Sequence, residues 1–415
     1  MVYLVGFLLL RKQVQVSNAD SYILVLNCGS SSIKFAIIQP ATGKMPLKGL
    51  AENLFTDNPL LTYESDGKKT SQRLPPKADH QKSLQNIVKI LAQFEQLKHQ
   101  IVAIGHRVVH GGELFAKSVR IDDSVIEGIN KTSLMAPLHN PANLAGINSA
   151  LLAFPELPQI AVFDTAFFQT LPKKAFLYAL PYHLYQEHGI RKYGFHGTSH
   201  YFVAHQAAKL LDKNIEKCNL ITAHLGNGCS VTAIKQGKTV DTSMGFTPLE
   251  GLIMGTRSGD IDPSLPSFMI DQLGYSASQV NSLLNKESGL LGISQLTNDC
   301  RELEQQAKLG NKQAQLALDM FCYRLVKYIG AYLAVVGPLD ALIFTGGIGE
   351  NSVYVRNKVV SQLSHLGLSI DTGLNEEMKL GRSGAINQAG SCSVFAIATN
   401  EEWVIAQDAA RLSQQ

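Results

Sequence analysis

The pattern of apolar and polar positions first shows two apolar runs joined by a short polar turn. This stretch, Tyr22 to Gln39, reads YILVLNCGSSSIKFAIIQ. Residues 23–26 suit a buried strand, residues 33–38 suit its returning partner, and Gly29 begins the turn. The pattern predicts a β-hairpin whose tip offers hydroxyls and backbone N–H groups, which together can hold an anion. A Walker A loop is excluded, because that loop leads into a helix.

The same layout returns in the second half of the chain. Residues 219–234 read NLITAHLGNGCSVTAI, again two apolar runs around a glycine-rich tip, and a polar third limb follows at residues 238–244. LNCGSSSIKFAI and AHLGNGCSVTAI match in arrangement. Two copies of a hairpin-led α/β unit predict two lobes whose glycine-rich tips face each other and grip a nucleotide.

Helices and strands alternate through the rest of the chain. Apolar residues recurring every three to four positions predict helices over residues 83–97, 144–153, 314–336 and 402–412. Continuous apolar runs predict buried strands over residues 101–104, 159–163, 339–345 and 394–398. The run GGIGEN, residues 346–351, is expected to open the helix that follows its strand. The order predicts an α/β protein.

Composition narrows the class of protein. A chain of 415 residues should form two domains, or three small ones, and its 45% hydrophobic and 17% charged residues are typical of a globular protein. A net charge of +3 gives no dense basic face, so we expect no nucleic-acid partner. The six cysteines form no CxxC pair, which favours reduced thiols in a cytoplasmic protein over a disulfide framework or a zinc site.

Two apolar segments raise the question of a membrane. Residues 2–10 are apolar, but nine residues fall short of the roughly 20 that a span needs, and no signal-peptide pattern surrounds them. Charged residues at 319, 324 and 327 interrupt the long apolar segment 314–336. We expect no membrane partner, and we interpret residues 1–20 as an extension outside the folded core.

Polar side chains suited to phosphoryl transfer follow several of the apolar runs. They are Arg107, Asp164, His196, His224, Asn227, Arg257, Glu401 and Glu402. Each alone is more often a structural residue or an ion-pair partner than a catalytic group. Open α/β sheets, however, bind ligands at the carboxyl ends of their strands, so the number of such endings indicates a site.

Several sequence motifs together resemble those of a known family. These motifs are NCGSSSIKF, GHRVVHGG, PLHNPANL, FDTAF, YGFHGTSH, HLGNG, DTSMGFTPLEGLIMGTRSGDIDP, FTGGIGEN and TNEE. From about Ile23 to the C-terminus, the chain closely resembles the acetate/propionate kinase family. The resemblance implies a duplicated actin-like, sugar-kinase-like (ribonuclease H-like) fold with an interdomain nucleotide cleft. It also implies reversible transfer of the γ-phosphoryl group of ATP to acetate, which yields acetyl phosphate and ADP.

The resemblance implies a role for each matching residue. Catalytic roles fall on Asp164, His196 and Arg257. Substrate-binding roles fall on Arg107, with Val109, Leu138, Phe195 and Pro248 around the acyl methyl group. ATP-binding roles fall on Ser30, Ser32, Lys34, His224, Leu225, Gly226, Asn227, Gly228, Asp299, Cys300, Arg301, Gly347, Ile348, Gly349, Glu350 and Asn351. Asn27 and Glu401 would hold Mg²⁺, with Mn²⁺ as a possible substitute.

The resemblance also sets expectations for organisation and partners. The N-terminal domain would comprise residues 21–165 with 402–415, and the nucleotide-side domain residues 166–401. A homodimer in the cytoplasm is expected, with a small carboxylate as substrate and ATP/ADP as co-substrate. One departure stands out: Phe168 occupies the position at which the family usually has histidine. If that histidine supports Asp164, activity or its pH dependence should differ here.

Three hypotheses about chemistry remain open. A small carboxylic acid is ionised at neutral pH, so Asp164 should orient metal or arginine rather than accept a proton. Val109 narrows the acyl pocket, which favours acetate over propionate. The alternatives to an acetate kinase are a propionate kinase of this family, a sugar or glycerol kinase of the same fold, and an actin-like ATPase whose nucleotide state switches a partner. The paired arginines favour an anionic acceptor over a hydroxyl.

Overall fold

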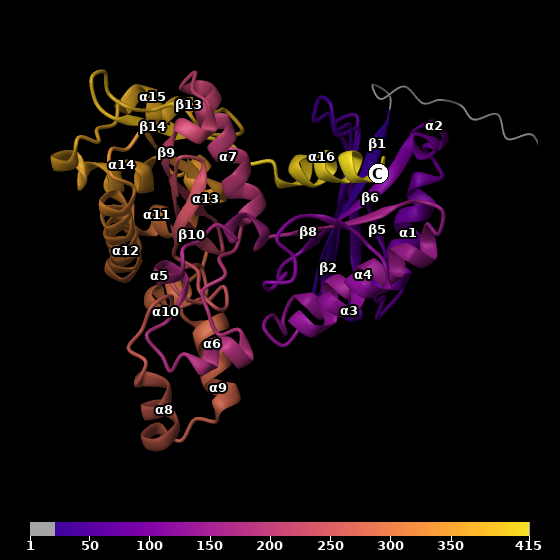
Figure 1. Ribbon diagram of the computed structural model, residues 1–415, viewed down its shortest axis with the longest axis horizontal. Helices are drawn as coiled ribbons and strands as arrows, with labels where there is room; N and C mark the ends of the chain where they lie inside the picture. The colour runs from indigo at the N-terminus through magenta and orange to yellow at the C-terminus, as the bar shows by residue number, and fades with distance from the viewer. Residues whose placement is uncertain (1–20, 415) are drawn as a thin grey trace, which may run out of the picture.

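Residues 21–414 are described here from a computed structural model (Figure 1). The chain forms two lobes, each built on its own β-sheet, joined where the chain crosses between them. The extension predicted at residues 1–20 lies outside the described residues. Between residues 21 and 414, no helix combines the length and apolar character that a bilayer crossing requires.

The first lobe contains an eight-stranded sheet. Its order is β5 (Lys68–Arg73), β4 (Leu60–Ser65), β3 (Leu47–Glu52), β2 (Ser32–Ile38), β1 (Tyr22–Gly29), β6 (Ile101–Val108), β8 (Gln159–Phe163) and β7 (Val119–Arg120). β1 pairs antiparallel with β2 and parallel with β6, and β6 pairs parallel with β8. The predicted first hairpin is therefore confirmed, with its tip at Ser30 and Ser31.

The second lobe repeats this pairing in a six-stranded sheet. Its order is β11 (Lys238–Thr242), β10 (Cys229–Lys235), β9 (Asn219–Leu225), β12 (Ala341–Thr345), β14 (Ser393–Ala396) and β13 (Gly384–Ala385). β9 pairs antiparallel with β10 and parallel with β12, and β12 pairs parallel with β14. The central five strands of the two sheets thus share order and direction, which confirms the predicted duplication.

Strand alternation explains how helices cover both faces of the first sheet. Successive side chains of a strand point to opposite faces. Leu24 and Leu26 accordingly lie in one apolar cluster, beneath α1 (His80–Leu91) and α4 (Asn140–Ala153). Ile23 and Val25 lie in another, beneath α16 (Glu401–Ser413), so the last helix of the chain packs on the first lobe. We propose the predicted boundaries, 21–165 with 402–415 and 166–401, for the two domains.

Helices also pack on both faces of the second sheet. One face carries α7 (Gly197–Leu210), and the other carries α12 (Lys312–Val336), which contacts β9, β10 and β11. The others are α2 (Glu95–His99), α3 (Asp123–Thr132), α5 (Lys173–Phe176), α6 (His183–His188), α8 (Leu265–Leu273), α9 (Ala277–Ser282), α10 (Gly289–Ser294), α11 (Cys300–Lys308), α13 (Gly346–Asn351), α14 (Val353–Ser361), α15 (Thr372–Glu377) and short turns η1 (Ala166–Phe168), η2 (Ile215–Lys217), η3 (Leu283–Glu287) and η4 (Ser364–Leu366).

Three predicted boundaries were wrong. The helix expected over residues 83–97 is two helices, because α1 ends at Leu91 and Phe94 leaves helical geometry to pack on the core. The strand expected to end at 104 continues to Val108, since β1 and β8 pair with it on both sides. The run GGIGEN is itself the short helix α13, not only the entrance to one.

Candidate active site

The first polar group of the site lies at the carboxyl ends of two neighbouring parallel strands. Arg107 is the next-to-last residue of β6, and Asp164 directly follows β8. The Arg107 Nη2 atom donates to Asp164 Oδ2 at 2.6 Å, and its Nε donates to Oδ1 at 3.0 Å. Asp164 is 1% exposed, and Arg107 keeps 20% of its side chain exposed. The pair therefore fixes the guanidinium while leaving one edge of it accessible.

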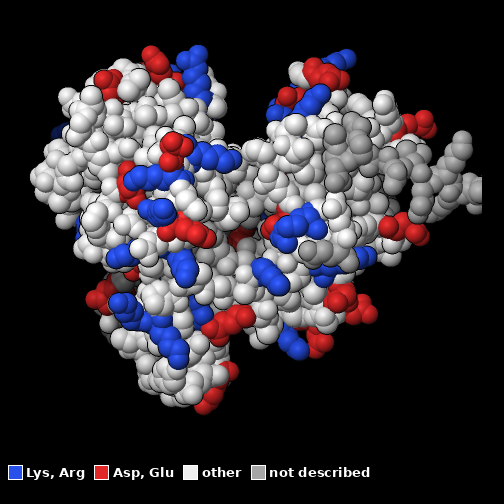
Figure 2. Space-filling view, turned by 45° about the horizontal axis from the view of Figure 1, so that its top comes forward, with Lys and Arg blue, Asp and Glu red and all other residues white. Residues whose placement is uncertain are grey.

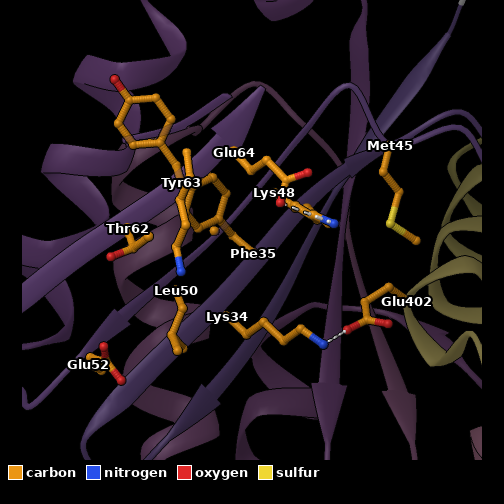
Figure 3. A pocket seen from close by; sticks show the side chains of 13 residues that line it. Lys34, Phe35, Met45, Lys48, Leu50, Glu52, Thr62, Tyr63, Glu64 and Glu402 are labelled. Carbon is orange, nitrogen blue, oxygen red and sulfur yellow. Dashed lines mark ion pairs between the residues drawn. The ribbon is translucent and has the colours of Figure 1, made fainter. Parts of the chain in front are cut away.

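The first turn of α16 adds two more carboxylates. Lys34 forms an ion pair with Glu402, which Figure 3 shows at one wall of a pocket of about 450 Å³ on the first sheet. Although burial opposes it, Asp164, Glu401 and Glu402 raise the pKa of Arg107. Burial would raise the pKa of Glu402, but Lys34 brings the net shift downward. The first-lobe site is thus a compact network of opposite charges.

The predicted metal ligands fit a divalent cation. Asn27 pairs across the hairpin with Lys34, so both side chains lie on the sheet face that α16 covers. Burial, followed by the nearby Asp164 and Glu402 carboxylates, raises the pKa of Glu401 to about 7. A bound cation would stabilise the ionised form of this buried carboxylate. Within residues 21–414 no three His, Cys, Asp or Glu side chains form a metal cage, but Mg²⁺ needs only one or two carboxylates beside water and phosphate.

The second polar group comes from the second lobe and is built on imidazoles. His196 precedes α7 in the left-handed conformation (φ 59°), and His224 lies near the end of β9. Their rings stack with centroids 4.3 Å apart. Burial lowers the pKa of His224 to about 4, and burial together with His224 and Arg107 brings the pKa of His196 well below its ordinary value. Both imidazoles are therefore neutral at pH 7.

Arg257 joins this second group without a counter-charge. Its Nη1 atom donates to the Pro248 carbonyl at 3.1 Å, and within residues 21–414 no carboxylate pairs with it. A Cβ added to Gly228 would lie 3.4 Å from both Arg257 Nη1 and His196 Nε2. Arg257 and His196 therefore converge on the glycine loop. Burial lowers the pKa of Arg257, as expected for a cation without a partner anion.

His139 links the two groups, and the sequence reasoning gave it no role. Burial, then Arg257 and then Arg107, lowers its pKa to about 4, so this half-buried imidazole lies within electrostatic reach of both arginines. The motif PLHNPANL contained it, but a lone histidine in a loop gives no spacing signal. Figure 2 shows the two lobes separated by a notch. The two polar groups thus occupy facing elements of the two lobes.

Two asparagines in the same motif were also missed. Asn143 donates to the Cys28 carbonyl at 2.7 Å and accepts from the Val109 amide at 3.0 Å. Asn140 accepts from the His110 amide at 3.1 Å. They tie the base of the first hairpin tip to the backbone after β6, which positions Arg107 relative to that tip.

The predicted acyl-pocket residues are brought together only in part. Val109 and Phe195 are 8% and 1% exposed and belong to one apolar cluster, although Val109 comes from the first lobe. Pro248 is half-buried, and its carbonyl holds Arg257. Leu138 is 50% exposed and lies outside the described apolar clusters.

The predicted nucleotide residues lie on the loops of both lobes. Ser30 is exposed at the first tip, and Ser32 begins β2. In the second lobe, His224 and Leu225 end β9, the run Gly226, Asn227 and Gly228 forms the loop, and the Asn227 side chain accepts from Asn298 at 2.9 Å. This contact places the glycine loop beside the predicted segment 299–301.

Several of these side chains have structural partners of their own. Asp299 caps α11, in which Cys300 is buried, and pairs with Arg301 at 2.6 Å. Glu350 accepts from the amides of Gly346 and Thr399. Asn351 donates to the Gly347 carbonyl, while Ile348 and Gly349 lie inside α13. A Cβ added to Gly347 would meet no atom within 4 Å, so its backbone faces open space.

Phe168 occupies an apolar environment. It is fully buried in a cluster with Leu171 and Phe176, and its ring lies edge-on to His200 with centroids 6.0 Å apart.

All six cysteines are unpaired, and five of them are buried. The predicted absence of a disulfide framework therefore agrees with the structure of the described chain.

Known proteins resemble this chain over almost its whole length. A family model described as the Acetokinase family matches residues 22–407. The acetate kinase of Shewanella frigidimarina is 55% identical over 395 residues, which cover 95% of this chain and 99% of that protein. The acetate kinase of Shewanella loihica is also 55% identical, with the same coverage.

Solved structures show the same similarity in three dimensions. A propionate kinase from Francisella tularensis matches with a TM-score of 0.90 at 48% identity, covering 94% of this chain and 100% of that one. The Porphyromonas gingivalis acetate kinase matches with a TM-score of 0.89 at 42% identity, covering 94% and 99%. These matches confirm the predicted duplicated actin-like, sugar-kinase-like fold. Since both sequence and structure match over almost their whole length, the chain belongs to the acetokinase family.

Proposed function

We propose that this protein is an acetate kinase, which transfers the γ-phosphoryl group of ATP directly and reversibly to acetate, yielding acetyl phosphate and ADP. The observation that carries the proposal is the contrast between its two arginines. Arg107 is held by a buried carboxylate and keeps one exposed edge, whereas Arg257 has no carboxylate partner among residues 21–414 and lies near His196. One suits a small carboxylate, and the other suits a phosphoryl group that gains charge during transfer.

In this reaction, Arg107 would bind acetate with Val109, Leu138, Phe195 and Pro248 around its methyl group. Asp164 would orient Arg107, because it occupies the Nε and Nη2 atoms, and in the described part of the chain no hydrogen bond takes up Nη1, which could bind the substrate. An ionised acceptor needs no general base. Asp164→Asn should therefore lower activity without removing a basic limb from the pH–rate profile. Selective loss of such a limb, with metal affinity unchanged, would contradict this role.

On the phosphoryl side, His196 and Arg257 would donate to the oxygens of the moving group, where negative charge is spread. Gly228 has no side chain, so phosphate can approach both donors closely. Lys34, with Ser30 and Ser32, would contact phosphate from the first lobe. Residues 224–228, 299–301 and 347–351 would hold the rest of the ATP.

A divalent cation would be held by Asn27 and Glu401. Mg²⁺ would neutralise the phosphate chain, and Mn²⁺ has the same preference for oxygen ligands. The raised pKa of Glu401, caused first by burial, supports this assignment, since a bound cation would stabilise the ionised form of this buried carboxylate. Glu401→Gln should weaken Mg²⁺ binding in calorimetry with ADP present. Glu64→Gln, in the pocket that Lys34 and Glu402 also line, should not.

The test of function measures ADP formation with acetate, propionate and butyrate, together with trapping of the acyl phosphate by hydroxylamine. We expect kcat/KM to fall in that order. The Francisella relative is named a propionate kinase, so equal or higher values for propionate would replace acetate by propionate. ADP formation that ignores the acid would favour an actin-like ATPase and overturn the proposal.

We further propose a homodimer in the cytoplasm. No residue of α8 is buried, and its apolar side chains Leu265, Phe268 and Leu273 are 40%, 50% and 58% exposed. α8 and α9 lie at the end of an arm that projects from the second lobe (Figure 1). Light scattering should give twice the chain mass for wild type and a monomer for Phe268→Glu. Six unpaired cysteines support a reducing compartment.

A further inference from the structure

A buried chain of hydrogen bonds runs from the second sheet to His196. Thr222 Oγ1 lies 2.7 Å from His200 Nδ1, His200 Nε2 lies 2.7 Å from Ser230 Oγ, and Ser230 Oγ lies 2.9 Å from His196 Nδ1. Thr222, His200 and Ser230 are all 0% exposed. His200 ends the motif YGFHGTSH, but nothing in the sequence links it to Thr222 or Ser230, and none of the three has a role in the proposed reaction.

The donors in this chain can all be satisfied in only one direction. A neutral imidazole has one N–H and one acceptor nitrogen, and a hydroxyl has a single proton to donate. If Thr222 donates to His200, then His200 donates to Ser230 and Ser230 donates to His196 Nδ1, so every proton of the three bonds has an acceptor. In the opposite direction, the Thr222 hydroxyl proton would have no acceptor among the described residues. A buried unmatched donor is costly, so the first direction is favoured.

We infer that Thr222, His200 and Ser230 form a positioning relay that holds His196 with its proton on Nε2, aimed at the phosphoryl group. This inference rests on the proposed function, because it assigns His196 a donor role in phosphoryl transfer. The Nε2 atom lies beside Gly228 and Arg257, where the proposed phosphoryl group would pass. The other tautomer would turn a lone pair toward phosphate oxygens and repel them.

The surroundings of the relay keep it neutral and fixed. Burial, with His224 nearby, brings the pKa of His200 well below its ordinary value, so His200 does not gain a second proton at pH 7. His224 stacks on His196 and is held separately, through Ser199 and Thr399, each bond measuring 2.8 Å. Phe168 covers the edge of the His200 ring.

Four variants test the relay by kinetics. Ser230→Ala removes the donor to His196 and should lower kcat about 10- to 100-fold with little change in KM, as expected when an interaction made in the transition state is lost. His200→Phe should do the same. His200→Gln should stay within about threefold of wild type, because its amide can replace both hydrogen bonds. His205→Gln, on the same helix but outside the relay, is the matched control.

A second readout does not depend on activity. Nitrogen chemical shifts of [15N]histidine-labelled protein, with His196 assigned by its loss in His196→Gln, should show an acceptor-type Nδ1 in wild type and a tautomer mixture in Ser230→Ala. Unchanged shifts and unchanged kcat in Ser230→Ala would overturn the relay, as would a protonated Nδ1 in wild type. If the wild-type protein forms no acyl phosphate, the proposed function fails and the shifts alone decide the relay.

Discussion

The two lobes share one strand arrangement and differ in the chemistry at its end. In the first lobe, the strand ends and α16 gather full charges that neutralise one another, as in Arg107 with Asp164 and Lys34 with Glu402. In the second lobe, the corresponding edge gathers neutral imidazoles held by hydroxyls, and its one cation, Arg257, has no carboxylate partner in the described chain. The duplicated fold places equivalent strand ends in both lobes, but the residues at those strand ends differ in charge.

Because of this difference, the charges of the first lobe should contribute to the stability of the fold, whereas Arg257 in the second lobe should contribute to anion binding. A buried carboxylate that loses its partner is strongly unfavourable, so the first-lobe network stabilises the fold while it positions Arg107. A cation without a partner adds nothing to stability, but it keeps its full attraction for an incoming anion. The following predictions test this contrast, beginning with the largest expected effect.

Arg107→Ala should damage both properties. Asp164, which is 1% exposed, would be left unpaired, so we expect the free energy of unfolding to fall by about 3–5 kcal/mol. We also expect the ADP formation that depends on acetate to be lost. Urea unfolding measures the first effect, and the assay of ADP formation with and without acetate measures the second. Lys48→Ala is the control, because its pair with Glu64 is about half exposed and should be worth less than about 1 kcal/mol. An Arg107→Ala protein as stable as wild type would contradict the contrast.

Arg257→Ala should damage activity alone. We expect kcat to fall about 100- to 1000-fold, as for loss of a donor that stabilises transition-state charge. The urea midpoint should stay within the range of ordinary surface changes, since no carboxylate loses its partner. If Arg257→Ala unfolds as readily as Arg107→Ala, then this cation has a structural role and the contrast between the lobes fails.

Buried neutral histidines should make the protein sensitive to acid. Burial lowers the pKa of His106 from 6.5 to about 4, although the hydrogen bond that its Nε2 donates to Gln159 Oε1 opposes the shift. Between those pH values the unfolded chain binds a proton that the folded chain does not, so stability falls as the pH falls. His106→Gln should remove about 1.4 kcal/mol per pH unit from that slope. His188→Gln, which is 61% exposed, should leave the slope unchanged.

Val109 marks the contact between the two regions and should give the smallest effect. It comes from the first lobe and packs in the apolar cluster of the second. Val109→Ala should narrow the preference for acetate over propionate by about 10-fold, because one methylene group contributes roughly 1–3 kcal/mol to discrimination. Ratios of kcat/KM for the two acids measure this. An unchanged ratio would place the acyl group elsewhere.

Periodicity predicted the elements well where local packing decides them. Both hairpins and the helix over residues 314–336 follow from apolar spacing alone. It failed at residues 105–108, because a polar run such as His106 and Arg107 becomes a strand only when β1 and β8 pair with it. The need for glycine at position 105 also comes from tertiary packing, since a Cβ there would lie 2.6 Å from Ile405 of α16.

The candidate site divides in the same way. Motifs predicted roles for Arg107, Asp164, His196 and Arg257. Two of the motifs also contain His139 and His200, but they gave no role to either and did not link His200 to Thr222 or Ser230. The roles of these residues depend on their neighbours in space.

The sequence by itself determined the order of strands and helices, the repeated hairpin and the family, because these depend on spacing and local residue types. Only the tertiary structure decided which charges neutralise each other, which arginine stays unmatched and which way a histidine presents its proton. Such properties depend on distance and burial, and both are set by contacts between segments far apart in the chain, as Pro40 and Trp403 are, at a separation of 363 residues.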